Sequence, residues 1–156
     1  MFSFVTLGTN DLKKSKIFYD ELLKSINIIN VEESDKYIGY AKKETLDKIE
    51  FYLMIPHNKQ KATFGNGTMI TFNIETKEGV ESFYNLALKL GATDEGLPGP
   101  RHEQDYYAYF RDLDGNKICA LVLINFNIQI VHLIFYPQLS DYYQIEFYNF
   151  YPTTIE

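Results

Sequence analysis

The chain has 156 residues, which is enough for one domain or for two small modules that share a core. Its formal net charge of −6 argues against a nucleic-acid partner, and no apolar run reaches the roughly 18 residues that span a bilayer. The single cysteine excludes an intrachain disulfide, and no charged segment precedes the first apolar residues as in a secretory signal, so we predict a cytoplasmic protein.

The first part of the chain is predicted to form a strand, a helix and three more strands. Residues 2–8 are apolar and β-branched, which indicates a strand, and residues 12–26 have the spacing of an amphipathic helix. Pro56 ends the last strand of this group, and a polar loop follows it. The three later strands are expected at residues 28–31, 37–41 and 49–55, and the loop at residues 57–66.

The same order of elements begins again after this loop. Residues 68–74 indicate a strand, and residues 76–90 indicate a helix with Gly91 as its C-terminal cap. The Gly- and Pro-rich segment at residues 96–100 is predicted to be a loop. An aromatic-rich hairpin follows that loop.

The hairpin contains an Asp-Gly turn, and its register decides which side chains share a face. A two-residue turn would pair Phe110 with Cys119. A three-residue loop of residues 113–115, with its glycine in the left-handed region, would pair Tyr109 with Cys119 instead. We favour the three-residue loop, because the Pro-free sequence suits a type I turn closed by a glycine bulge. Tyr107 would then share a face with Tyr109 and Cys119.

The two groups of elements are related as an internal repeat. Identical residues coincide in register along the first strand and the helix, and the ends of the two groups also match. We therefore predict two copies of a β-α-β-β-β module, which could enclose a cavity between their curved sheets. The matches are Thr6 with Thr71, residues 18–19 with 83–84, residues 23–24 with 88–89, and residues 47–50 with 116–119. Module one would span residues 1–56, the linker 57–65 and module two 66–123, all within one domain of residues 1–123.

Taken together, these motifs resemble the vicinal oxygen chelate superfamily, which includes glyoxalases, bleomycin-resistance proteins and extradiol dioxygenases. The resemblance covers residues 1 to about 123. It implies an α+β, glyoxalase-like fold, in which paired βαβββ modules form an incomplete barrel around a shared cavity. The residues that carry it are 4–12, 18–19, 65–68, 99–102, 107–109 and 112–117.

Active members of that superfamily hold a divalent metal with His, Gln or Glu on the first and last strands of each module. The resemblance places those positions here at Phe4, Glu50, Met69 and Cys119. Phe4 cannot ligate, a Met thioether is a poor ligand for hard cations, and Cys119 would lack partners. Because one carboxylate does not hold a catalytic divalent ion, we predict no metal and no other cofactor.

The cavity is expected to bind a small molecule, and three residues are also candidates for catalysis. Glu50 could act as a general base if it is buried, or it could be solvated or paired with Lys48. His102 would titrate near neutral pH, and Tyr109 carries a hydroxyl that requires a partner when buried. Cys119 is expected to be a small buried hydrophobe. The candidate ligand-binding residues are Phe4, Thr6, Glu50, Tyr52, Met69, Thr71, Arg101, His102, Tyr107, Tyr109 and Cys119.

Three functions are compatible with the sequence. The first is a metal-free protein that binds a small apolar or aromatic ligand. The second is a lyase or dioxygenase-type enzyme that uses a displaced metal or acid–base residues. The third is an interaction protein that forms a homodimer through residues 124–156. That extension has no Lys or Arg and many aromatic residues, and we expect it to form a β-hairpin that docks on its own domain or on a partner subunit.

Overall fold

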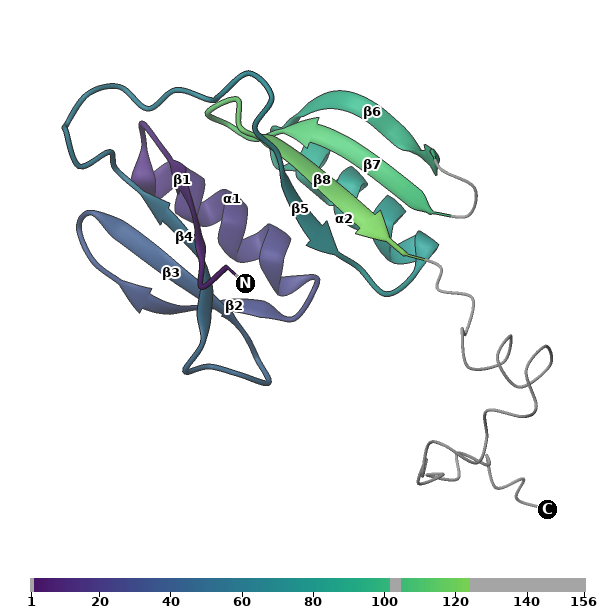
Figure 1. Cartoon of the computed structure of the whole chain (residues 1–156), viewed down its shortest axis with the longest axis horizontal. Coiled ribbons are helices and arrows are strands. Elements are labelled where there is room, and N and C mark those ends of the chain that lie inside the picture. Colours follow the sequence, from purple (N-terminus) through teal and green to yellow (C-terminus); the bar gives the residue numbers. More distant parts are fainter. Residues whose placement is uncertain (1, 102–104, 124–156) are drawn as a thin grey trace, which may run out of the picture. The chain divides into compact units, whose positions relative to one another are not determined.

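The fold is given by a computed structural model that describes residues 2–101 and 105–123 (Figure 1). Residues Met1–Ile124 form one compact unit. The predicted C-terminal hairpin and the candidate His102 lie outside the described residues. Within the described residues, no helix is long and apolar enough to cross a membrane.

Module one is a four-stranded sheet, here called sheet A, with one helix packed on it. Strand β1 runs parallel to β4, whereas β4, β3 and β2 are antiparallel neighbours. The helix begins after Asp11, whose carboxylate accepts a hydrogen bond from the backbone N–H of Lys14 at 3.0 Å. The elements are β1 (Val5–Gly8), α1 (Leu12–Lys24), β2 (Ile28–Glu33), β3 (Tyr37–Lys42) and β4 (Ile49–Met54).

Module two repeats this arrangement in a second sheet, here called sheet B. Its strand order β5-β8-β7-β6 matches the order β1-β4-β3-β2 of sheet A. Thr76 caps the helix, as Asp11 does in module one. The α+β class and the paired βαβββ modules are therefore confirmed, and within the described residues the sheets form no closed barrel. The elements are β5 (Ile70–Asn73), α2 (Lys77–Lys89), β6 (Thr93–Pro100), β7 (Tyr106–Arg111) and β8 (Lys117–Val122).

The prediction of a loop at residues 96–100 is wrong, because these residues belong to strand β6. Among the described strands, β6 lies at the edge of sheet B and has β7 as its single partner. An edge strand tolerates prolines, since one side of its backbone needs no partner in the sheet. Two irregularities in the pairing, on either side of Gly96, absorb the Gly- and Pro-rich sequence.

The predicted register of the β7–β8 hairpin is confirmed. Tyr109 pairs with Cys119, and the loop has three residues between Asp112 and Asn116, which are joined by a backbone hydrogen bond of 3.0 Å. Gly115 has a φ of 88°, in the left-handed region that closes a type I turn with a glycine bulge.

The predicted match between the two module ends is shifted in the structure. Thr6 pairs with Tyr52 in sheet A, whereas Thr71 pairs with Cys119 in sheet B. Since Thr6 and Thr71 are equivalent, Cys119 corresponds to Tyr52 and not to Glu50.

A β-bulge explains part of this shift. Tyr40 pairs with Phe51 and Ala41 pairs with Ile49, so Glu50 is an extra residue in β4. Comparison of the two sequence segments cannot detect such an insertion, because a bulge changes the pairing without breaking the strand.

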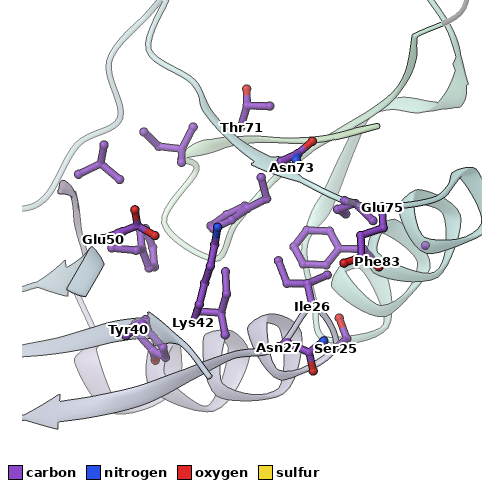
Figure 2. A pocket seen from close by; sticks show the side chains of 18 of the residues that line it. Ser25, Ile26, Asn27, Tyr40, Lys42, Glu50, Thr71, Asn73, Glu75 and Phe83 are labelled. Atoms are coloured by element: carbon purple, nitrogen blue, oxygen red, sulfur yellow. The ribbon is translucent and has the colours of Figure 1, made fainter. Parts of the chain in front are cut away.

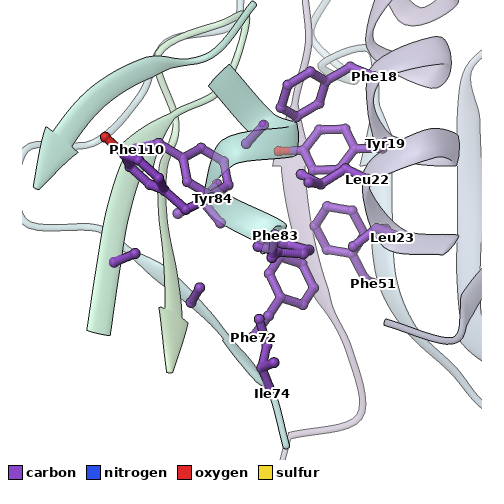
Figure 3. Close-up of a cluster of buried hydrophobic side chains, with 14 of the residues drawn as sticks. Phe18, Tyr19, Leu22, Leu23, Phe51, Phe72, Ile74, Phe83, Tyr84 and Phe110 are labelled. Atoms are coloured by element: carbon purple, nitrogen blue, oxygen red, sulfur yellow. The ribbon is translucent and has the colours of Figure 1, made fainter. Parts of the chain in front are cut away.

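The core joins the two modules through aromatic rings (Figure 3). Phe51 of sheet A contacts Phe72 of sheet B with ring centroids 5.7 Å apart and planes at 76°. Phe72 then contacts Phe83 of α2 at 5.9 Å, and Phe83 contacts Phe110 of β7 at 6.0 Å. Tyr19 of α1 contacts Phe51 at 5.2 Å, so a continuous line of rings runs from one module to the other.

The β7–β8 turn of module two also contacts the start of α1 in module one. The hydroxyl of Tyr19 donates to the carboxylate of Asp112 at 2.7 Å. Asp114 accepts from the side-chain amide of Asn10 at 2.8 Å and from the hydroxyl of Ser15 at 3.1 Å. Two acidic residues of one turn thus hold the N-terminal half of a helix in the other module.

We expect Tyr19→Phe to lower the free energy of unfolding by about 1–3 kcal/mol, because it removes a donor from a buried carboxylate. Tyr84→Phe is a matched control, since that hydroxyl also donates to an aspartate, Asp94, at 2.7 Å, but within module two and in a partly buried position. Urea unfolding of both variants measures the two losses. A loss for Tyr19→Phe no larger than that for Tyr84→Phe would contradict the importance of the inter-module hydrogen bond.

Candidate functional site

A cavity of about 910 Å³ lies between the two modules, and we call it the inter-module groove (Figure 2). It is bounded by the C-terminal end of α1, by β1, β3 and β4 of sheet A, and by β5 and the start of α2. Its apolar lining includes Tyr40, Phe51, Phe72 and Phe83, which belong to the aromatic core. These rings are almost fully buried, so they form the floor of the groove, and its accessible apolar side chains include Phe2, Ile26, Ile28, Met69 and Ile70.

The rim of the groove is polar. It includes Lys42 at the end of β3, Glu50 in the bulge of β4, and Thr71 and Asn73 on β5. Figure 2 shows Lys42 and Glu50 projecting from sheet A, with Thr71 and Asn73 on the opposite wall. The alternation of a strand places Thr71 and Asn73 on the same side of β5. The rim can therefore donate hydrogen bonds to a ligand and accept them from it.

Glu50 is held as a carboxylate by neighbouring lysines. Its oxygen lies 2.8 Å from Nζ of Lys48, and this hydrogen bond lowers the pKa of Glu50 below its usual value. Burial acts in the opposite direction, and the positive charge of Lys42 adds to the lowering. The paired alternative for Glu50 is thus the one observed, and a general base with a raised pKa is not.

Three of the predicted ligand-binding residues line the groove, namely Glu50, Met69 and Thr71. The other described candidates do not. Thr6 and Tyr52 lie on strands of sheet A, and Phe4 directly precedes β1. Tyr107, Tyr109 and Cys119 lie on strands of sheet B, and Arg101 directly follows β6. The structure therefore divides the predicted set between the groove and two separate sheets.

The face of sheet B that points away from α2 carries an aromatic and cationic cluster. The rings of Tyr107 and Tyr109 stack with centroids 6.0 Å apart and planes at 12°. The guanidinium carbon of Arg101 lies 5.9 Å from the centre of the Tyr109 ring, and Nζ of Lys117 lies 5.3 Å from it. Burial raises the pKa of Tyr109, so its hydroxyl stays protonated at neutral pH.

Cys119 is fully buried beneath this cluster. Burial raises the pKa of its thiol, and this effect exceeds the lowering by Thr71 and Lys117. A thiol in that state is a small hydrophobe rather than a nucleophile, as the sequence suggested.

The four residues that the resemblance placed at metal positions do not fit a metal. The ring of Phe4 packs against Tyr52 with centroids 5.2 Å apart, Glu50 is paired with Lys48, Met69 is 42% exposed, and Cys119 is fully buried. Among the described residues, no three His, Cys, Asp or Glu side chains come close enough together to hold an ion.

Several groove residues were missed from the sequence. Asn73 could have been found, because it lies two positions after Thr71 on the same strand and strand side chains alternate. Lys42 and Phe83 gave no such signal, since only the packing of the two modules places them on one cavity.

The chain matches solved structures, although two other comparisons with known proteins found no match. No model of a protein family matches the sequence, and no curated protein matches it. Solved structures do match, beginning with a glyoxalase/bleomycin resistance protein from Albidiferax ferrireducens at 39% identity and a TM-score of 0.71, covering 79% of this chain and 98% of that one.

Two more distant structures share the fold. A glyoxalase/bleomycin resistance protein/dioxygenase family enzyme from Burkholderia phytofirmans has 18% identity, a TM-score of 0.63 and coverage of 78% of this chain and 98% of that one. A fosfomycin resistance protein from Mesorhizobium loti has 15% identity, a TM-score of 0.60 and coverage of 83% and 97%. With 39% identity over nearly the whole of the Albidiferax protein, the chain belongs to the glyoxalase/bleomycin resistance protein family.

Proposed function

We propose that this protein binds a small apolar or aromatic molecule in the inter-module groove. The observation that carries the proposal is a cavity of about 910 Å³ that is lined by apolar side chains from both modules. Ligand sites for small molecules are typically concave, of a few hundred to about 1,000 Å³, and mostly apolar with a few polar groups. The groove has this size and this composition.

The lining determines which part of a ligand lies where. The accessible apolar lining, which includes Phe2, Ile26, Ile28, Met69 and Ile70, would contact a ring or an aliphatic body. Polar substituents would reach the rim, where Lys42 can donate to an oxygen and Asn73 can both donate and accept.

The alternative is a lyase or dioxygenase-type enzyme, and the described residues give it less support. An acid–base mechanism would need a group whose pKa lies near neutral pH. The pKa of Glu50 is lowered, and those of Tyr109 and Cys119 are raised. All three groups are thus moved away from neutral pH, which favours binding over catalysis at these residues, and the remaining catalytic candidate, His102, lies outside the described residues.

Filling the groove should abolish ligand binding. We expect Asn73→Trp to reduce binding of the aromatic dye 1-anilinonaphthalene-8-sulfonate by about tenfold or more, because an indole on the rim would occupy the cavity. Fluorescence titration of the native protein and the variant measures this change. Val31→Trp is the matched control, since Val31 is a partly exposed residue of β2 outside the groove lining. Equal affinity of the two variants for the dye would contradict the proposal.

The protein is predicted to bind no divalent metal at the family position. Calorimetric titration with Zn²⁺, Mn²⁺ and Ni²⁺ should give no stoichiometric binding, because the described residues contain no group of three His, Cys, Asp or Glu side chains that could hold an ion. Glu50→Gln should leave the titration unchanged. Tight one-to-one binding that disappears in Glu50→Gln would contradict this prediction and favour an enzyme.

A homodimer is also part of the proposal. Large apolar side chains remain exposed on the described part of the chain, including Phe2 at 79% and Leu97 at 66%. Sedimentation velocity should then give twice the chain mass of 18.2 kDa, falling to a single chain on dilution. A concentration-independent mass of one chain would contradict it.

A further inference from the structure

The face of sheet A that points away from α1 has a cluster that the groove does not use. Glu32, Gly39, Tyr52 and Thr6 form one row across the four strands, because each is the register partner of the next. Paired residues of neighbouring strands point to the same face. Since Phe51 and Leu53 are buried on the helix side, Tyr52 and its row point outward.

Gly39 leaves room in this row for a neighbouring ring. A Cβ atom at position 39 would lie 2.9 Å from Cε1 of Tyr52, which is closer than real Cβ contacts. The absence of a side chain therefore allows the Tyr52 ring to lie over the sheet and reach across β3 to Glu32 on β2.

Two tyrosines hold the Glu32 carboxylate from opposite oxygens. The hydroxyl of Tyr37 donates to Oε1 at 2.8 Å, and the hydroxyl of Tyr52 donates to Oε2 at 3.2 Å. The carboxylate raises the pKa of both tyrosines, together with burial, so both remain donors at neutral pH. The group is thereby fixed in orientation.

Glu32 has no cationic partner among the described residues, unlike the acidic residue beside it. Glu33 lies 3.6 Å from Nζ of Lys16, so only one of these two neighbouring carboxylates has a lysine beside it. Neutral tyrosine hydroxyls hold the Glu32 carboxylate but do not balance its negative charge.

The aromatic rings near Glu32 form two nearly perpendicular pairs, both of which include Tyr52. Phe4 meets Tyr52 with centroids 5.2 Å apart and planes at 78°, and Tyr37 meets Tyr52 at 5.9 Å and 74°. Phe4 is 55% exposed, so its ring is accessible from outside. Perpendicular aromatic walls beside a carboxylate are the surroundings that favour a methylated ammonium group, through cation–π attraction and charge.

We propose that Phe4, Tyr37, Tyr52 and Glu32 form a binding site for a small organic cation that carries a methylated ammonium group. None of these four residues lines the inter-module groove, so the site is separate from the one proposed above. The ammonium would contact the ring faces, and its charge would be balanced by the fixed carboxylate of Glu32.

Choline chloride is the probe, and 3,3-dimethyl-1-butanol is its neutral counterpart of the same shape. Both are titrated into the full chain labelled with ¹⁵N, and binding is followed by NMR chemical shifts. We expect saturable binding of choline in the millimolar range, with the neutral alcohol binding about tenfold more weakly or less, because it lacks the charge.

Two variants and one control locate the site. Glu32→Gln keeps an acceptor for the tyrosines but removes the charge, and should weaken choline binding about tenfold. Phe4→Ala removes an exposed wall, and should weaken it severalfold without affecting the core. Glu33→Gln should leave choline binding unchanged.

The proposal is overturned if choline fails to saturate, if the neutral alcohol binds equally well, or if Glu32→Gln binds choline as tightly as the native chain. A loss with Glu33→Gln equal to that with Glu32→Gln would also overturn it, since it would indicate attraction to the surface as a whole.

Discussion

The carboxylate of Asp112 is the group on which the arrangement of the two modules depends. It is 6% exposed, and its Oδ2 accepts hydrogen bonds from the hydroxyl of Tyr19 at 2.7 Å and the amide of Asn116 at 2.9 Å. Its Oδ1 accepts from the backbone N–H groups of Asp114 and Asn116. Burial raises the pKa of Asp112, and these hydrogen bonds partly offset that effect. The same group thus shapes the turn of module two and binds the helix of module one.

The β7–β8 turn, the linker and the aromatic core all contribute to the contact between the two modules. Burial raises the pKa of Asp114, but hydrogen bonds from Thr9, Asn10 and Ser15 lower it further, so its carboxylate stays charged beside the start of α1. The linker crosses the same region, where the amide of Ala62 donates to Asn10. With this end fixed by polar contacts and the interior fixed by rings, the inter-module groove is a stable feature of the fold rather than a gap between independent units.

The outward faces of the two sheets differ in chemistry although the modules share a topology. Sheet A presents a carboxylate held by two tyrosines, whereas sheet B presents Arg101 and Lys117 around the ring of Tyr109. Gly39 of sheet A is equivalent to Tyr109 of sheet B, because Gly39 pairs with the partner of Thr6 and Tyr109 pairs with the partner of Thr71. The rows thus differ at two positions: sheet A has Gly39 and Tyr52 where sheet B has Tyr109 and Cys119, so the ring comes from β4 in sheet A and from β7 in sheet B.

The sequence by itself determined the modules, their order and the register of the β7–β8 hairpin, because helix periodicity, strand alternation and turn chemistry are local. The prediction from sequence was wrong for β6, because a Pro-rich strand is possible only through its edge position in sheet B. The predicted match of Glu50 with Cys119 was also wrong, because the residue order does not reveal a β-bulge. The tertiary structure alone decided which candidate residues meet. The modules pack through their helix sides, as the contact of Phe51 with Phe72 shows, so Tyr52 and Tyr109 point away on separate sheets. That choice of packing faces depends on contacts between residues far apart in the chain, which a repeat within the sequence does not encode.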